Sequence, residues 1–179
     1  MNESYSENNL QNLNKNWYAL YTKPRHEFKA AENLNTVKVE YYLPTVTKLK
    51  QWSDRKKKVV EPLIHGYIFV FATLKERILA LQQNGIVRCV SFHGQPAVVP
   101  EWQIDNLKRM LNHGSDFIIS EVIKAGTRVK VIEGPFQGVI GVVNYSKNGK
   151  TISITLDLLK RSITAVLPAE SVIKVIEEE

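Results

Sequence analysis

Alternating and periodic apolar positions divide the chain into short strands and amphipathic helices. Residues 17–21 are aromatic and apolar and predict a strand, and Pro24 follows at a position suited to the first turn of a helix. Apolar side chains then recur at helical spacing at Phe28, Ala31 and Leu34. The pattern predicts a strand followed by a helix that lays one apolar stripe on a sheet.

The middle of the chain combines a polar ribbon with one strongly apolar strand. Residues 45–52 alternate as a strand does, residues 53–55 have turn chemistry, and residues 56–63 run back, which predicts a hairpin. Residues 66–71 are apolar at every position after the glycine, as in a strand that is covered on both faces. We expect this segment to be the central strand of a sheet.

Helical spacing predicts two more helices, over residues 74–83 and 100–112, with a strand over residues 86–92 between them. Their apolar stripes are Leu74, Ile78 and Leu81 in the first helix, and Ile104, Leu107 and Leu111 in the second. Strands that alternate with helices, together with the hairpin, predict an α+β sandwich with a mostly antiparallel sheet over residues 17–112.

From Val122 onward nearly every segment reads as strand. Alternation on both sides of Gly134-Pro135 predicts a hairpin, and further strands are predicted over residues 151–156, 163–167 and 172–176. Five short strands in about 60 residues predict a small β-barrel domain. The fold class is therefore α+β, with a disordered tail over 1–16, an N-terminal domain over 17–112, a linker over 113–121 and a barrel over 122–179.

Composition narrows the class of function. The 179 residues carry a formal net charge of +6, which favours polyanionic partners or acidic surfaces. No apolar run is long enough to span a membrane, and the Asn- and Ser-rich start lacks the apolar core of a secretion signal. We expect a cytoplasmic protein that acts as a monomer and does not bind a membrane.

The residues that enzymes and metal sites need are not grouped along the sequence. The single cysteine, Cys89, excludes an internal disulfide and is expected to be a buried small residue. The four histidines stand far apart, and no phosphate-binding glycine loop or nucleophile elbow is present. We therefore predict no enzyme activity, no cofactor and no metal.

Three segments in series carry a family resemblance. Residues 17–23, residues 62–70 and the segment 123–143, which looks like a KOW motif, resemble the NusG-like transcription elongation factors in that order. More closely, the chain resembles the specialised RfaH and UpxY branch, whose members act as antiterminators on particular long operons, including capsular polysaccharide operons. The resemblance implies a NusG-type N-terminal domain followed by a five-stranded KOW barrel.

The resemblance implies a polymerase site on the N-terminal domain. In the family, an apolar hollow of this domain docks on the clamp helices of RNA polymerase, and Arg77 stands near the loop that makes a second polymerase contact. By position, the contacts would be Leu63, Ile64, Tyr67, Phe69, Phe92, Ile104 and Leu107. Because residues alternate along the central strand, at least one of its faces is also intradomain core.

Two basic segments are candidates for contact with upstream or non-template DNA. The hairpin carries Lys48, Lys50, Trp52, Arg55, Lys56, Lys57 and Lys58. Its cations would neutralise phosphates and Trp52 would stack on a base; a solvated ribbon with Trp52 packed on the sheet is the alternative. The second segment is Lys23, Arg25 and Lys29, which matches where RfaH-type factors read DNA, with Lys23 alone keeping the matching residue type.

The barrel is the adaptor in this family and reaches a ribosomal protein or the terminator Rho. The matching positions are Phe136, Leu158, Leu159 and Arg161, for which core or turn packing is the alternative. A second class of function also fits these patterns: a ribosome-associated RNA-binding protein whose barrel and hairpin contact ribosomal RNA. The apolar central strand and the helix at Ile104 favour the transcription factor.

Overall fold

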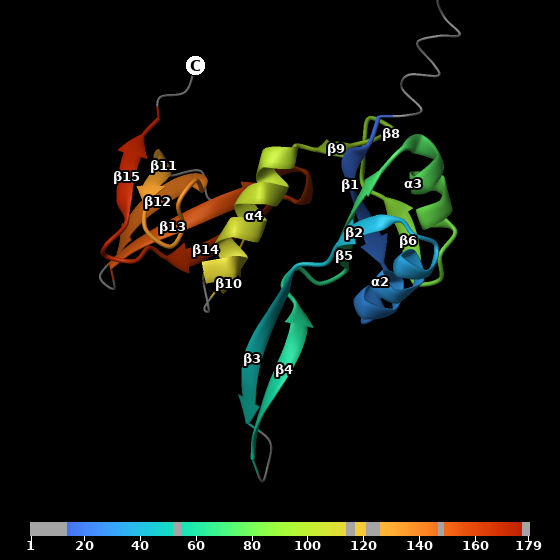
Figure 1. Cartoon of the computed structure of the whole chain (residues 1–179), viewed down its shortest axis with the longest axis horizontal. Helices are drawn as coiled ribbons and strands as arrows, with labels where there is room; N and C mark the ends of the chain where they lie inside the picture. The colour runs from blue at the N-terminus through green and yellow to red at the C-terminus, as the bar shows by residue number, and fades with distance from the viewer. Residues whose placement is uncertain (1–13, 52–54, 114–116, 121–125, 147–148, 177–179) are drawn as a thin grey trace, which may run out of the picture. The chain divides into compact units, whose positions relative to one another are not determined.

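The computed structural model describes residues 14–51, 55–113, 117–120, 126–146 and 149–176. The chain divides into two compact units. Unit 1 comprises residues 1–45 and 62–101, and unit 2 comprises residues 46–61 and 102–179. Figure 1 shows the elements of both.

Unit 1 is built on a five-stranded antiparallel sheet in the order β2-β5-β1-β6, with β9 also paired to β1. Its strands are β1 (Asn16–Thr22), β2 (Glu40–Tyr42), β5 (Tyr67–Ala72), β6 (Ile86–Cys89) and β9 (Val98–Val99). The strands β7 (Ser91–Phe92) and β8 (Gln95–Pro96) form a separate small hairpin. The sequence predictions of β1 and of an internal β5 are confirmed.

Helices α2 (Glu27–Thr36) and α3 (Leu74–Leu81) pack on this sheet (Figure 1). Leu20, Ile68 and Val70 of the sheet form one apolar cluster with Ala30 and Leu34 of α2. Ala80 of α3 and Cys89 of β6 also belong to it, so the expected burial of Cys89 is confirmed. Burial raises the pKa of the Cys89 thiol, which keeps it protonated.

The predicted apolar stripes of α2 and α3 are partly wrong. Phe28, Leu74 and Ile78 are exposed, whereas the carboxylate residue Glu27 is buried. Glu27 Oε1 accepts a hydrogen bond of 2.7 Å from the Gly66 N–H, and this contact satisfies the buried oxygen. The contact of Glu27 with Gly66 joins residues 39 positions apart, so the apolar periodicity of α2 gives no signal for it.

The predicted hairpin is formed by β3 (Thr45–Gln51) and β4 (Lys56–Pro62). Among the strands that the structure describes, these two pair only with each other (Figure 1). Residues 47–51 and 55–58 are exposed, so this part of the ribbon is solvated on both faces.

The C-terminal part of unit 2 contains a six-stranded antiparallel sheet in the order β10-β14-β13-β12-β11-β15. The strands are β10 (Phe117–Ser120), β11 (Thr127–Glu133), β12 (Ile140–Ser146), β13 (Gly149–Leu156), β14 (Arg161–Val166) and β15 (Val172–Val175). A short 3-10 helix, η1 (Asp157–Leu159), precedes β14. Five of the strands follow the predicted pattern, and β10 lies within residues 113–121, which we predicted to be a linker.

The helix α4 (Glu101–His113) lies on the C-terminal sheet within unit 2. Gln103 Nε2 donates to an Asp157 carboxylate oxygen at 2.5 Å, and Arg109 Nη1 donates to the Gly138 carbonyl at 3.2 Å. Asn106 makes two hydrogen bonds with the main chain of Ile140. We predicted that this helix belongs to the N-terminal domain, residues 17–112. In the structure, residues 102–113 of the helix belong to unit 2 instead.

Candidate functional site

The face of the unit 1 sheet that α2 and α3 leave uncovered is lined by aromatic side chains. Leu20, Ile68 and Val70 point to the helix-covered core, so their neighbours along β1 and β5 point to the other face. We call this surface the aromatic face; its members are Trp17, Tyr21, Tyr42, Tyr67, Phe69 and Phe71.

Cross-strand pairing sets the spacing of the aromatic face. Trp17 stands opposite Phe71 and Tyr21 opposite Tyr67, with ring centroids 5.2 and 4.4 Å apart. The Tyr67 hydroxyl donates to the Tyr21 hydroxyl at 2.5 Å, and the Arg88 guanidinium lies 4.9 Å from the Tyr21 ring centroid. These contacts hold the rings in fixed positions before any partner binds.

The aromatic face combines buried anchors with accessible rings. Phe69 and Trp17 are buried, whereas Tyr21, Tyr67 and Phe71 are half-buried. The burial of Phe69 is a correction to our expectation that it contacts the polymerase directly. Tyr42 is also half-buried, and burial raises the pKa of its phenol above the ordinary value, so the hydroxyl stays a neutral hydrogen-bond donor. Large rings with accessible polar tips are typical of protein-binding surfaces.

The other predicted polymerase contacts of unit 1 fall into two groups. Phe92, on β7, is 68% exposed, and its ring stands edge-on to His93 with centroids 4.2 Å apart. Leu63 and Ile64, which we expected among the polymerase contacts, are instead buried. Their burial corrects our expectation that they face the polymerase. The Leu63 N–H donates to the Pro44 carbonyl at 2.8 Å, and this bond fixes the segment within the fold.

Arg77 is used within the fold. Its guanidinium carbon lies 5.0 Å from the Tyr18 ring centroid, and its Nε is buried. The structure therefore does not present Arg77 as an extended surface cation, in contrast to our expectation of a second polymerase contact.

Ile104 and Leu107 are fully buried, and both belong to α4 in unit 2. We expected them to line a hollow of the N-terminal domain. The reason for the difference is the row of polar side chains at Gln103, Asn106 and Arg109, which holds α4 on the C-terminal sheet.

The basic hairpin is accessible over most of its length. Lys48, Arg55, Lys56, Lys57 and Lys58 are exposed. Lys50 is exposed as well and forms an ion pair with Glu61, so its charge is partly neutralised. Trp52 lies outside the described residues.

The second basic segment lies at the end of β1 and the start of α2. Lys23, Arg25 and Lys29 are all exposed, and Lys29 Nζ is 3.0 Å from Glu32. An exposed pair of this kind is weak, so Lys29 remains available to an anion. Arg25, in the left-handed region with φ of 62°, borders a cavity of about 410 Å³ that Tyr21, Glu27 and His65 also line.

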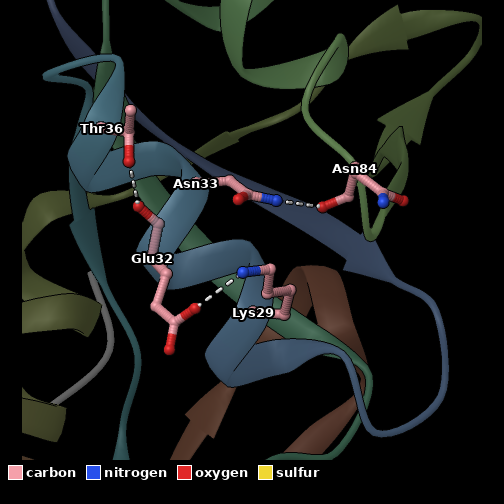
Figure 2. Close-up of polar contacts among 5 residues, drawn as sticks. All are labelled: Lys29, Glu32, Asn33, Thr36 and Asn84. Atoms are coloured by element: carbon pink, nitrogen blue, oxygen red, sulfur yellow. Dashed lines mark hydrogen bonds and ion pairs between the residues drawn. The ribbon is translucent and has the colours of Figure 1, made fainter.

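Sequence reasoning missed a polar cluster beside this segment, which Figure 2 shows. Asn33 Nδ2 donates to the Asn84 carbonyl at 2.8 Å, and Thr36 Oγ1 donates to the Glu32 carbonyl at 3.0 Å. Asn33 and Asn84 are 51 positions apart in sequence, so spacing alone gave no signal for them. The cluster widens the polar surface around Lys29.

The four predicted contacts of the C-terminal sheet also separate by burial. Arg161 is exposed and Leu158 is half-buried. Phe136 and Leu159 are buried, which is a correction to our expectation that they face a partner. Their apolar side chains fill the core of this part of unit 2.

Comparisons with known proteins identify the family. The family model described as "Transcription termination factor nusG" matches residues 15–108. The transcription termination/antitermination protein NusG of Lactococcus lactis subsp. lactis (strain IL1403) is 24% identical over an alignment of 174 residues, and the match covers 87% of this chain and 91% of that protein.

A solved structure has the same fold. The structure described as "Domain interaction in Thermotoga maritima NusG" is 22% identical, with a TM-score of 0.54, and the match covers 89% of this chain and 97% of that chain. The chain belongs to the NusG family and is a NusG-like transcription termination/antitermination factor. No helix among the described residues is long and apolar enough to cross a membrane.

Proposed function

We propose that the chain binds the clamp helices of transcribing RNA polymerase through the aromatic face of unit 1. The observation that carries this proposal is the ladder of aromatic pairs on the sheet face opposite α2 and α3, with Tyr21 and Tyr67 half-exposed. A helical hairpin offers an apolar ridge, and a surface of fixed aromatic rings is a suitable receptor for it. Phe92, on the separate β7–β8 hairpin, is a further exposed aromatic side chain that would contact the polymerase in this proposal.

We further propose that the chain is a specialised antiterminator of the RfaH and UpxY type. Such a factor suppresses pausing or termination on particular operons, and the resemblance suggests operons for polysaccharide biosynthesis. The bound chain would contact upstream DNA through the exposed lysines of the hairpin and non-template DNA through Lys23, Arg25 and Lys29. Each neutralised phosphate adds salt-dependent affinity.

The C-terminal sheet acts in this proposal as a KOW adaptor. Its accessible residues at the predicted site are Leu158 and Arg161, and these would contact a ribosomal protein or Rho. Its buried residues, Phe136 and Leu159, would support the sheet instead of binding a partner.

A binding assay with purified elongation complexes tests the polymerase site. Replacing Phe92 with alanine should weaken binding about tenfold or more, since exposed aromatic anchors often dominate an interface. Tyr145→Ala is the matched control, because Tyr145 is an exposed aromatic residue of the C-terminal sheet, 71% accessible. Equal binding by the Phe92 variant and the wild type would reject Phe92 as a contact. Retention of ribosomes in place of polymerase from lysate would reject the polymerase site.

The salt dependence of the same assay tests the hairpin. A chain with Lys56, Lys57 and Lys58 replaced by alanine should lose affinity and show a salt slope smaller by about one for each phosphate contact removed. Lys108→Ala and Lys174→Ala, outside the hairpin, serve as charge controls. An unchanged slope would show that the ribbon does not contact DNA.

A further inference from the structure

The hairpin of β3 and β4 carries two exposed aliphatic side chains among its lysines. Leu49 is 66% exposed and Val60 is 52% exposed. Because both are mostly accessible to solvent, their burial contributes little to the stability of the folded chain. A single exposed aliphatic residue is normal on a protein surface, but two that share one face of a ribbon form a patch that a partner can cover.

An ion pair shows that Leu49 and Val60 lie on the same face of the ribbon. The Lys50 ammonium contacts the Glu61 carboxylate, so these two side chains share a face. Side chains alternate along a strand, so the neighbouring residues Leu49 and Val60 both point to the opposite face. We call this surface the aliphatic face; by the same alternation its members are Thr47, Leu49, Gln51, Lys56, Lys58 and Val60.

The charge around the aliphatic face favours a polyanion as its partner. Residues 45–62 contain six basic residues and two acidic ones. Lys56 and Lys58 are exposed on the aliphatic face, and Lys48 is exposed on the other face. An apolar protein surface that covered the patch would have to remove water from these ammonium groups, whereas the phosphates of a nucleic acid would neutralise them. Nucleic acid is therefore a better occupant than protein.

The dimensions of a two-stranded ribbon fit the major groove of duplex DNA. Among the described strands, β3 and β4 pair only with each other, so no third strand widens the ribbon (Figure 1). Paired strands lie about 4.8 Å apart, and the major groove, about 12 Å wide, admits such a ribbon, whereas the minor groove is only about 6 Å wide. In the major groove, thymine presents its C5-methyl group, which apolar side chains contact.

We propose that the aliphatic face enters the major groove of duplex DNA and that Leu49 and Val60 contact the C5-methyl groups of thymine. Lys56 and Lys58 flank these contacts and neutralise phosphates at the border of the groove. Such base contact rests on the proposed function, in which the hairpin binds upstream DNA, and adds specificity to it. The lysines supply affinity for any sequence, and the aliphatic pair makes the affinity depend on the bases.

Two DNA duplexes that differ only in methyl groups test the proposal without any change to the protein. One is a fluorescein-labelled duplex of alternating adenine and thymine, and in the other deoxyuridine replaces every thymidine, which removes only the C5-methyl groups. At a fixed low salt concentration, the full-length wild type should bind the thymine duplex about fourfold more tightly for each methyl group that it buries. Equal affinity for the two duplexes, or no binding to either, would overturn the proposal.

A double substitution assigns the preference for thymine to the hairpin. The variant with Leu49→Ser and Val60→Ser should bind the two duplexes equally, while its salt slope stays that of the wild type, because no lysine is changed. The matched control is Val166→Ser with Val175→Ser, since both valines are exposed aliphatic residues of the C-terminal sheet, and this control should keep the preference. A preference that survives in the hairpin variant would contradict the roles of Leu49 and Val60.

Three outcomes separate the base contact from the proposed function. If replacing Lys56, Lys57 and Lys58 with alanine lowers the salt slope but the wild type does not distinguish thymine from uracil, the hairpin contacts DNA and only the base contact is rejected. An unchanged salt slope would reject the DNA contact and the base contact together. If the Leu49 and Val60 variant binds elongation complexes more weakly yet still prefers the thymine duplex, the aliphatic face binds a protein, and the proposal is overturned.

Discussion

The side-chain amide of Asn106 binds both main-chain polar groups of Ile140. Asn106 Nδ2 donates to the Ile140 carbonyl at 2.9 Å, and the Ile140 N–H donates to Asn106 Oδ1 at 3.2 Å. Asn106 is almost completely buried, so water cannot replace either bond. Asn106 of α4 therefore binds the main chain of Ile140, which is the first residue of β12.

Replacing Asn106 with alanine should destabilise unit 2. The change leaves the N–H and carbonyl of Ile140 without their partner, and we expect a cost of about 1–3 kcal/mol in the free energy of unfolding. Urea denaturation followed by fluorescence measures it. Arg109→Ala removes a more exposed bond to Gly138 and should cost less, so an equal loss for the two variants would contradict the assigned role.

Glu27→Ala should destabilise unit 1 by a related mechanism. The Glu27 carboxylate accepts the Gly66 N–H, and Gly66 also accepts the Thr22 N–H at 2.9 Å, so one glycine joins α2 to two strand ends. Loss of the buried acceptor should cost about 1–3 kcal/mol. Glu27→Gln retains an acceptor oxygen and should recover most of the stability in thermal unfolding; failure to do so would show that the charge matters more than the hydrogen bond.

Helix α3 should lose stability in acid through Glu76. Burial opposes ionisation of this carboxyl, but hydrogen bonds from Thr73 and the nearby Lys15 ammonium, 3.1 Å away, outweigh it and lower the pKa of Glu76 below its ordinary value. Thr73 and Glu76 also cap the helix reciprocally. Because the folded-state pKa is depressed, this stabilisation is present above the ordinary pKa and is lost as the pH falls through the folded-state value.

The test of Glu76 compares unfolding of the wild type and of Glu76→Gln at several pH values. Between about pH 5 and pH 3 the wild type should lose more stability than the variant, because only the wild type has this carboxylate to protonate. Parallel curves for the two proteins would show that Glu76 does not contribute to the acid sensitivity.

Gly141→Ala should disrupt the C-terminal sheet. A Cβ at position 141 would lie 2.5 Å from the Ser153 carbonyl oxygen and 3.0 Å from an Ile152 side-chain carbon, so strands β12 and β13 would have to move. We expect a loss of about 1–3 kcal/mol, as for overpacked cores. Gly94→Asn is the control, since space is open around Gly94 and asparagine tolerates its left-handed backbone; an equal loss would contradict the steric explanation.

Local sequence patterns predicted most of the strands and the three α-helices in the part of the chain that the structure describes. The run at residues 66–71 and the alternation at residues 17–21 are continuous in sequence, so a short window contains the whole signal. The polar character of the hairpin was equally local, and the structure exposes its lysines. The family followed from the order of three such segments, and the comparison with NusG confirmed it.

Burial of individual candidates was harder to predict. Phe69 and Phe92 are both aromatic residues at strand positions, yet one is completely buried and the other is exposed. Alternation divides a strand into two faces, but it does not say which face a second layer covers. Leu63, Ile64, Phe136 and Leu159 lie in a bend, a turn or the 3-10 helix, where no alternation separates two faces, so their burial was not predicted from the sequence.

By itself, the amino-acid sequence determined most of the strands, the described α-helices, the basic ribbon and the family, because each depends on residues close together in the chain. Only the tertiary structure decided that Asn106 holds α4 on the C-terminal sheet and that residues 117–120 form an edge strand. Those features depend on partners that are 34 or more positions away. Hydrogen bonds between distant segments form only when the fold brings donor and acceptor together. The sequence around the donor or the acceptor therefore does not predict such a bond.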